Sequence, residues 1–265
     1  TMNYYLAALS TKIWMMPLGT LNFNGIVIEI PFAKKALEDF KIRPQMGRRE
    51  EYKGFIESIT ESDFTAPYKE DMQKLIDTLA AQIIKDVATD RGLEVSDVQK
   101  MLDESPYTPK EAVSRKLIDD IGYKDQMKEA IEKKLGQKTT YHSFDSYLKT
   151  VKPSSKGEKI AIIYAEGNIT KGKTTKNPFS DDLVMDASEI AKMIRQARED
   201  DSIKAIILRV DSPGGNPIAS ELIGREMDLT KPKKPVIVSM SNYAASGVYW
   251  ISCNARKIVA QPGTV

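Results

Sequence analysis

The chain has 265 residues, a length that suits one large domain or two small ones. Hydrophobic residues make up 41% and charged residues 29%, which favours a globular fold over disorder. The net charge of +2 gives no electrostatic reason to expect nucleic acid or an anionic membrane surface as partner. The single cysteine excludes an intrachain disulfide and a cysteine-rich zinc site, and the single histidine leaves few ways to build a histidine-based active site.

The two ends of the sequence indicate an internal piece of a longer protein. No run of about 18 apolar residues is present, and no signal peptide is visible. The chain starts at Thr1, next to the helix-like segment Tyr4–Leu9, and it stops just after a strand-like run. We therefore expect further sequence on both sides.

The first half is predicted to be mostly helical after a short strand at Ile26–Ile30. Apolar residues recur at helical spacing over Pro67–Val87, which predicts one long amphipathic helix. Thr108 is followed by proline and, three positions on, by glutamate, the pattern of a capped helix start. A further helix is expected over Asp125–Leu135, ended by Gly136.

A stretch rich in proline, serine, lysine and glycine at residues 149–157 is typical of a linker. We accordingly expect a first domain over residues 1–150, a linker over 151–157 and a second domain over 158–265. The second domain alternates short β-branched apolar runs with helical patterns, which predicts βαβ units and a parallel sheet with strands buried on both faces. The expected strands are Ile160–Tyr164, Ala205–Val210, Val236–Met240 and Lys257–Ala260, and the expected helices are Asp186–Arg198 and Pro217–Met227.

Residues near the C-terminus resemble those near the N-terminus at an offset of 245 positions. The identities are Tyr249 with Tyr4, Lys257 with Lys12, Ile258 with Ile13 and Pro262 with Pro17. We interpret this as two copies of one α/β unit, of which the chain contains the end of one and most of the other. The alternative is that any helix–strand joint shows such a pattern.

Two loops of the second half have the composition of a reactive site. The loop Asp211–Asn216 contains Gly214 and Gly215 between a strand and a helix, which suits an oxyanion hole, a phosphate cradle or simply a tight turn. The second loop places Ser246 among small residues at a helix start, as a nucleophile or as a helix cap.

A nucleophilic serine needs a base, and the only histidine, His142, lies near the linker, where a surface role is expected. A catalytic serine would therefore pair with a lysine, and Lys53 is one candidate among several. Cys253 is predicted to lie in the core.

The two loops together resemble the signal peptide peptidase A family, the serine peptidases of family S49 with a ClpP/crotonase-like fold. The resemblance rests on Asp-Ser-Pro-Gly-Gly at 211–215 and Asn-Tyr-Ala-Ala-Ser-Gly-Val-Tyr-Trp at 242–250. Tyr52, Lys53 and Gly54, followed by Glu57, resemble the segment that carries the family's catalytic lysine, although the family commonly has serine at the position of Gly54. The stretch 107–122 also resembles the family, and the repeat offset fits its long, duplicated form.

This resemblance implies an α/β fold of tandem crotonase-like units with parallel sheets flanked by helices. Residues 1–150 would be the C-terminal part of the first half and residues 158–265 the N-terminal part of the second. The chain would be a serine endopeptidase with a Ser–Lys dyad, in which Ser246 is the nucleophile, Lys53 the general base, and Gly214, Gly215 and Gly247 supply the oxyanion donors.

The same resemblance implies no cofactor and no metal. The substrates would be remnant signal peptides, and the oligomer would be a ring of identical chains. The catalytic domain would lie on the outer, periplasmic side of the bacterial inner membrane, attached through a segment absent from this chain.

Of three alternative functions, two stay open and one is rejected. A crotonase-like acyl-CoA hydratase or isomerase would use a carboxylate such as Glu221, and a related membrane-associated scaffold would have no catalytic residue. An N-terminal threonine hydrolase built on Thr1 is rejected, because Thr1 is the repeat partner of Ser246.

Overall fold

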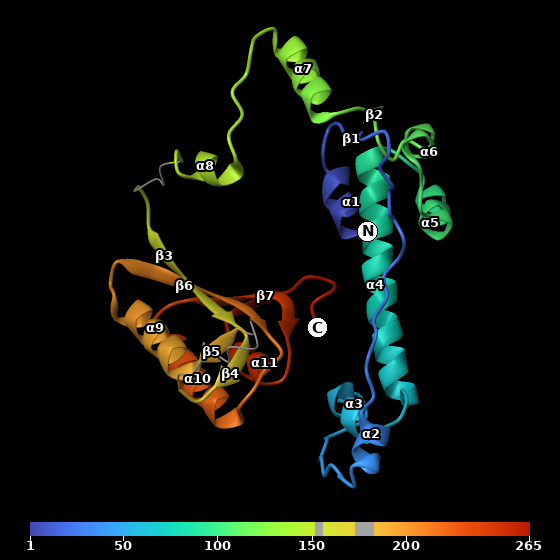
Figure 1. The fold of residues 1–265 in the computed structure, drawn as a ribbon. Helices are drawn as coiled ribbons and strands as arrows, with labels where there is room; N and C mark the ends of the chain where they lie inside the picture. The colour runs from blue at the N-terminus through green and yellow to red at the C-terminus, as the bar shows by residue number, and fades with distance from the viewer. Residues whose placement is uncertain (152–155, 173–182) are drawn as a thin grey trace. The chain divides into compact units, whose positions relative to one another are not determined.

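The structure, a computed structural model, describes residues 1–151, 156–172 and 183–265 (Figure 1). The chain divides into two compact units, Thr1–Ser143 and Phe144–Val265. The linker expected at residues 151–157 begins eight residues beyond this division, and its residues 152–155 lie outside the described part. The assignment of the two units to halves of a duplicated protein stays a prediction.

Unit 1 is mainly helical, as the sequence predicts. Its elements in chain order are α1 (Met2–Ala8), β1 (Trp14–Met15), α2 (Lys34–Asp39), the 3-10 helix η1 (Gly54–Ile56), α3 (Glu57–Thr60), α4 (Ala66–Arg91), α5 (Val95–Glu104), α6 (Pro109–Ser114), β2 (Asp120–Ile121) and α7 (Lys124–Leu135).

The helix ends confirm the local signals of the sequence. The long helix α4 ends at Gly92, which adopts a left-handed φ of 62° that favours glycine. Helix α6 carries the predicted capping box between Thr108 and Glu111, and α7 ends at Gly136 as predicted.

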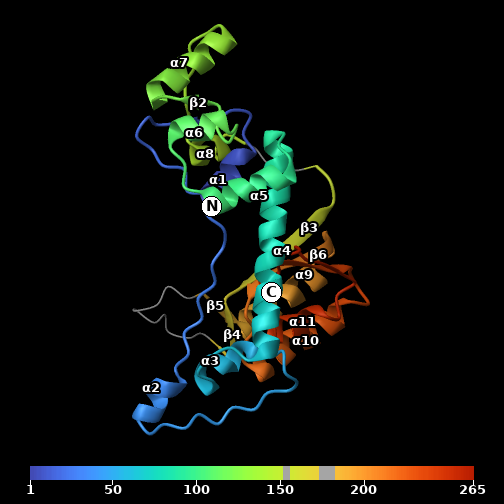
Figure 2. The ribbon, with the colours of Figure 1, turned by 90° about the vertical axis from the view of Figure 1, so that its right-hand side faces the viewer.

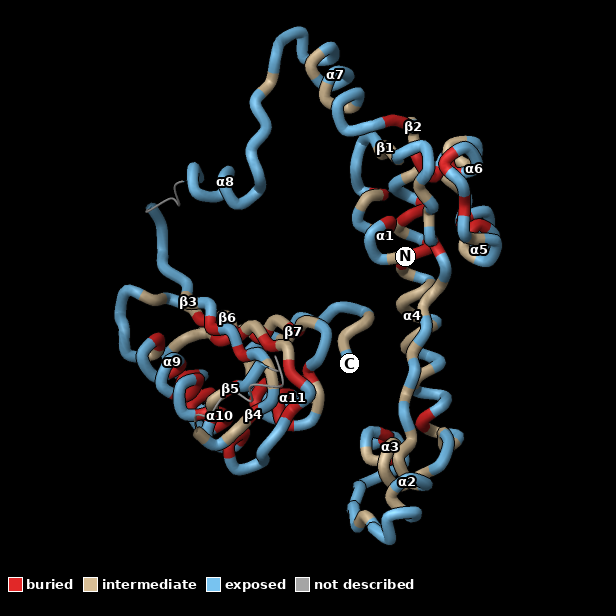
Figure 3. Tube along the Cα trace, viewed as in Figure 1, coloured by how far each residue is buried: buried red, intermediate tan, exposed pale blue. Residues whose placement is uncertain are grey.

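Unit 1 is organised around the two ends of α4. Figures 1 and 2 place α1, α5 and α6 at one end and α2 and α3 at the other. The main core lies at the first end, where Phe23, Val87, Val98 and Leu117 are fully buried (Figure 3). The other end holds a small aromatic cluster in which Phe64 contacts Phe32 and Tyr68.

The strand predicted at Ile26–Ile30 is wrong. These residues are in extended or irregular backbone, and β1 and β2, which pair in parallel, are the strands of unit 1, all of whose residues are described. A β-branched run becomes a strand only where a neighbouring strand accepts its backbone hydrogen bonds, and no described strand lies beside this segment.

Unit 2 confirms the predicted α/β class. It contains α8 (Phe144–Leu148), β3 (Lys159–Glu166), β4 (Asn168–Thr170), β5 (Val184–Asp186), α9 (Ala187–Glu199), β6 (Ile203–Ser212), α10 (Pro217–Thr230), β7 (Val236–Ala244), α11 (Gly247–Ser252) and β8 (Lys257–Val259). Four strands form a parallel sheet in the order β3-β6-β7-β8, and β4 and β5 form a separate parallel pair.

One face of this sheet forms the core of unit 2, with alternate strand residues packed against α9, α10 and α11. The prediction that the strands are buried on both faces is wrong for β3 within this unit, because Ile160, Ile162 and Tyr164 are 56%, 55% and 61% exposed. The three helices all pack on the same side of the sheet, so the opposite side chains of β3 face outward.

The local structure supports the repeat at the offset of 245. The helix α1 followed by β1 corresponds to α11 followed by β8, and three backbone hydrogen bonds recur at equivalent positions. The pairs of donor and acceptor are Tyr5–Thr1 with Trp250–Ser246, Ser10–Ala7 with Ala255–Ser252, and Gly19–Met16 with Thr264–Gln261.

Candidate active site

The first predicted loop joins β6 to α10 and needs glycine at two successive positions. Gly214 and Gly215 have φ values of 105° and 149°, which side chains other than glycine rarely adopt. Asn216 then caps α10, since its side chain accepts a hydrogen bond from the Ala219 N–H at 3.0 Å. The loop therefore turns sharply at the carboxyl end of the sheet, where ligands of open α/β sheets bind.

Ser246 lies in the second loop, between β7 and α11, with φ 51° and ψ −116°. This backbone conformation is costly for a serine, by about 1–3 kcal/mol, and such strain concentrates at functional sites. Ser246 is exposed, and its hydroxyl group donates to no acceptor among the described residues. The strained turn thus presents a free hydroxyl at the surface of unit 2.

The two loops touch each other at Ser246. A Cβ atom added to Gly214 would lie 2.8 Å from the Ser246 Cβ atom, and one added to Gly247 would lie 2.4 Å from the Ser220 Oγ atom. At Gly214 the close backbone and Cβ atoms and the positive φ require glycine, and at Gly247 a side chain would displace the Ser220 hydroxyl group. The structure therefore brings together four of the five predicted site residues: Ser246, Gly214, Gly215 and Gly247.

The backbone N–H groups of these glycines differ in availability. The Gly214 N–H donates to the Ser212 Oγ atom at 3.1 Å, whereas those of Gly215 and Gly247 donate to no acceptor among the described residues. The Gly215 nitrogen lies 3.5 Å from the position of a Cβ atom on Gly247. Among the described residues, the Gly215 and Gly247 N–H groups are therefore the donors available for the predicted oxyanion hole, which stays a prediction.

Two residues of the first motif act as supports whose roles the sequence did not reveal. Ser212 is fully buried and occupies the Gly214 N–H. Asp211 accepts hydrogen bonds from the Tyr243 N–H at 3.0 Å and the Asn242 side-chain amide at 3.3 Å, which ties the two loops together. The sequence shows a carboxylate at the end of a strand. It does not show that its partners lie on another strand, 31 and 32 residues away.

Lys53 belongs to unit 1, at the start of η1, and its side chain is exposed within that unit. The dry environment that a catalytic lysine needs is therefore not supplied by unit 1 alone. The next residue, Gly54, is buried against Tyr68, and a Cβ atom at Gly54 would lie 2.2 Å from the ring. The pairing of Lys53 with Ser246 stays a prediction.

The remaining candidate residues lie outside this arrangement. His142 and Glu221 are exposed, in a loop and on α10 respectively. The prediction that Cys253 is a core residue is wrong, because Cys253 follows the last turn of α11, where it is exposed and its thiol donates to the Trp250 carbonyl at 3.1 Å. The hydroxyl of Thr1 donates to the Asn24 and Gly25 carbonyls.

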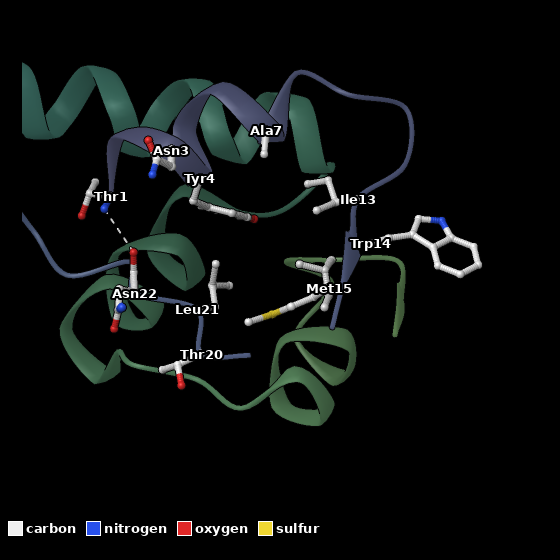
Figure 4. Close-up of a pocket in the computed structure, with 11 residues that line it drawn as sticks. Thr1, Asn3, Tyr4, Ala7, Ile13, Trp14, Met15, Thr20, Leu21 and Asn22 are labelled. Carbon is white, nitrogen blue, oxygen red and sulfur yellow. Dashed lines mark hydrogen bonds between the residues drawn. The ribbon is translucent and has the colours of Figure 1, made fainter. Parts of the chain in front are cut away.

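A pocket of about 330 Å³ in unit 1 contains none of the predicted site residues. Figure 4 shows it between α1 and the chain around Leu21, with Tyr4 and Met15 directed inward and the Trp14 indole directed away. Across the described ranges, no group of three or more histidine, cysteine or acidic residues could hold a metal ion. Within those ranges, no helix is both long and apolar enough to cross a membrane.

The strained Ser246 and two N–H groups that donate to no described acceptor match what a serine acyl-transfer site would need. The family model described as "Peptidase family S49" matches residues 1–138 and 228–265, and the chain belongs to that family. The family resemblance of the sequence is thereby confirmed.

Curated relatives match almost the whole chain. Protease 4 of Salmonella typhi is 33% identical and Protease 4 of Haemophilus influenzae 30% identical, each over 99% of this chain and 44% of the relative. The chloroplastic serine protease SPPA of Arabidopsis thaliana is 29% identical over 97% of this chain and 39% of the relative. The chain thus spans less than half the length of these relatives.

Solved structures match a smaller part of the chain. A mutant of ClpP1 from Listeria monocytogenes is 18% identical with a TM-score of 0.27, over 36% of this chain and 46% of that one. A mutant of the membrane-bound stomatin-specific protease 1510-N is 24% identical with a TM-score of 0.31, over 40% of this chain and 44% of that one.

Proposed function

We propose that the protein is a serine endopeptidase in which Ser246 is the nucleophile and Lys53 the general base. The observation that carries the proposal is the strained, exposed Ser246 beside the unused N–H groups of Gly215 and Gly247. Membership of family S49 and the serine protease names among the relatives support the same reaction class.

In the proposed reaction, Ser246 Oγ attacks the carbonyl carbon of a peptide bond while its proton passes to the neutral amine of Lys53. The Gly215 and Gly247 N–H groups hold the oxygen that becomes negative in the tetrahedral intermediate. Its collapse expels the amine, which takes the proton, and leaves an ester on Ser246. Water then attacks the ester while the lysine accepts its proton, and the lysine returns that proton to the Ser246 oxygen as the acyl–oxygen bond breaks and the acid product leaves.

A lysine can act as base only when it is neutral, and an ordinary lysine, with a pKa of about 10.4, is charged at pH 7. Full burial lowers a lysine pKa by about 3–5 units, which is enough for this chemistry. Because Lys53 is exposed within unit 1, the proposal requires that assembly or substrate covers it. An apolar peptide would serve this purpose.

We further propose remnant signal peptides as the substrates, a ring of identical chains as the assembly, and the outer side of the bacterial inner membrane as the location. The exposed side chains of Tyr243, Tyr249 and Trp250 near Ser246 suit an apolar peptide. A curated relative in Enterococcus faecium, 30% identical over 48% of this chain, is named a putative signal peptide peptidase SppA. The two units would be parts of the two halves of a duplicated protein, which the recurring hydrogen bonds support.

The test uses the full-length protein and a fluorophosphonate, which modifies activated serines. We expect the label on Ser246, and we expect Ser246→Ala to lose the label and at least about a thousand-fold of peptide hydrolysis. Ser252→Ala is the control, because it removes the same hydroxyl group from a buried serine that donates only to the Val248 carbonyl of its own helix. This variant should keep both the label and the hydrolysis. Retained hydrolysis by Ser246→Ala would refute the nucleophile.

A further inference from the structure

Unit 1 buries one carboxylate that the proposed reaction does not use. Glu57 is only 1% exposed, begins α3, and lies four residues after Lys53. A buried carboxylate is stable only when charged partners or hydrogen bonds compensate for the water it has lost. Its partners therefore show what the residue holds in place.

These partners lie on both sides of Lys53 in the sequence. Arg48, five residues before Lys53, forms an ion pair with the Glu57 carboxylate and donates a hydrogen bond to it. Thr65, which precedes the long helix α4, donates to it from its hydroxyl at 2.8 Å and from its backbone N–H at 3.3 Å. Glu57 thereby joins three points of the chain, and the loop that carries Lys53 lies between the first two.

The segment directly after Lys53 is held by packing. Gly54 is buried against the Tyr68 ring so closely that no side chain fits there. Tyr68 in turn contacts Phe64, with ring centroids 5.4 Å apart. Lys53 thus stands next to a fixed glycine, in a segment fixed at Glu57.

The charge of Glu57 is consistent with this role. Burial raises the pKa of its carboxyl group, but the hydrogen bonds from Thr65 and Arg48 outweigh burial and leave the pKa below its usual value. The carboxylate is therefore ionised wherever the peptidase reaction could run, and its charge is balanced by Arg48.

We propose that Glu57 is a positioning residue that fixes the Lys53 loop through Arg48 and Thr65, so that the amine of Lys53 reaches the nucleophile in its neutral form. This inference rests on the proposed function of Lys53 as the base. A purely structural Glu57 would affect stability and the amount of active protein, but not the pH at which the active protein works.

The experiment measures kcat, KM and the pH profile of the full-length protein. In Glu57→Gln, the amide cannot form an ion pair with Arg48, so the loop loosens and the Lys53 amine is held less firmly where assembly or substrate would cover it. Loss of the negative charge alone would favour the neutral amine, so a shift of the acidic limb to higher pH would report lost positioning. We expect kcat at pH 7 to fall about ten-fold or more with little change in KM, and the acidic limb of the profile to move to higher pH by about half a unit or more. Raising the pH should restore part of the activity.

A second variant guards against a folding defect. Thr65→Val keeps the size of the side chain and alters no charge, but removes the hydroxyl bonds to Glu57, so it should shift the acidic limb in the same direction by a smaller amount. Glu111→Gln is the matched control. Its carboxylate also accepts from a threonine hydroxyl and backbone N–H, both of Thr108, at the start of another helix, and it should leave the profile unchanged.

The outcomes separate the two proposals. If Ser246→Ala is inactive but Glu57→Gln and Thr65→Val keep the wild-type pH profile, the positioning role is refuted and the proposed reaction stands. If Ser246→Ala remains active, the proposed reaction fails, and the role of Glu57 fails with it.

Discussion

The loops that carry Ser246 and Lys53 are held in place in different ways. Around Ser246 the backbone holds the loop, because Gly214 lets two segments of the chain approach more closely than a side chain would allow. Around Lys53 the buried Glu57 carboxylate and its two partners fix the loop, and Gly54 packs against the Tyr68 ring. The comparison teaches that positioning by glycines leaves a pattern that is visible in a sequence, whereas positioning by side-chain contacts does not.

Among substitutions that leave Ser246 and Lys53 in place, the largest effect is expected from Gly214→Ala, which tests whether shape alone positions Ser246. Its new Cβ atom would lie 2.8 Å from the Ser246 Cβ atom, at a φ of 105°. Since displacing reacting groups by about 1 Å can cost about a hundred-fold, peptide hydrolysis should fall by about that factor or more. Steady-state hydrolysis by the full-length protein gives the measurement.

The matched control for this substitution is Gly157→Ala. Gly157 has a similar φ of 116°, but no atom of the described residues lies within 4 Å of the position of its Cβ. It should therefore show backbone strain without loss of catalysis. Equal losses of hydrolysis in both variants would mean that strain, and not contact with Ser246, is responsible.

A smaller effect is expected from Gly54→Ala, which tests whether packing holds the Lys53 loop. The added methyl group would lie 2.2 Å from the Tyr68 ring, so the ring or the loop must move. Overpacking of this kind costs about 1–3 kcal/mol of the free energy of unfolding. We expect kcat to fall while labelling of Ser246 by fluorophosphonate changes less, and a smaller residue at position 68 should recover part of the loss. An unchanged kcat would show that the loop tolerates movement.

The smallest effect is expected from His142→Ala. His142 is exposed and belongs to neither loop. Hydrolysis and its pH profile should therefore stay within a few-fold of the wild-type values. A loss near a thousand-fold would restore a histidine base and remove Lys53 from the mechanism.

The elements that sequence reasoning predicted well are those with local causes. The helix α4, the capping box of α6, the glycine after α7 and the parallel strands of unit 2 all follow from spacing or from residues within a few positions. The strand at Ile26–Ile30 failed because strand formation depends on a neighbour, which the segment itself does not specify.

Within the candidate site, the same distinction applies. The close approach of Gly214 to Ser246 was expected from the motifs, and it is present. The hydrogen bond from the Gly214 N–H to Ser212, the bridge made by Asp211 and the contacts of Glu57 were not expected, because each depends on side-chain geometry. A sequence lists these residues but does not show which atoms they face.

The exposed position of Cys253 has a practical consequence. It is the only cysteine of the chain, and it stands at the end of the helix that begins after Ser246. In this chain, a thiol-reactive spin label can therefore be attached there without removing other thiols, and paired with a second label on a cysteine introduced next to Lys53. Distance measurements between the two labels, with and without a peptide ligand, would then report the separation of the two loops.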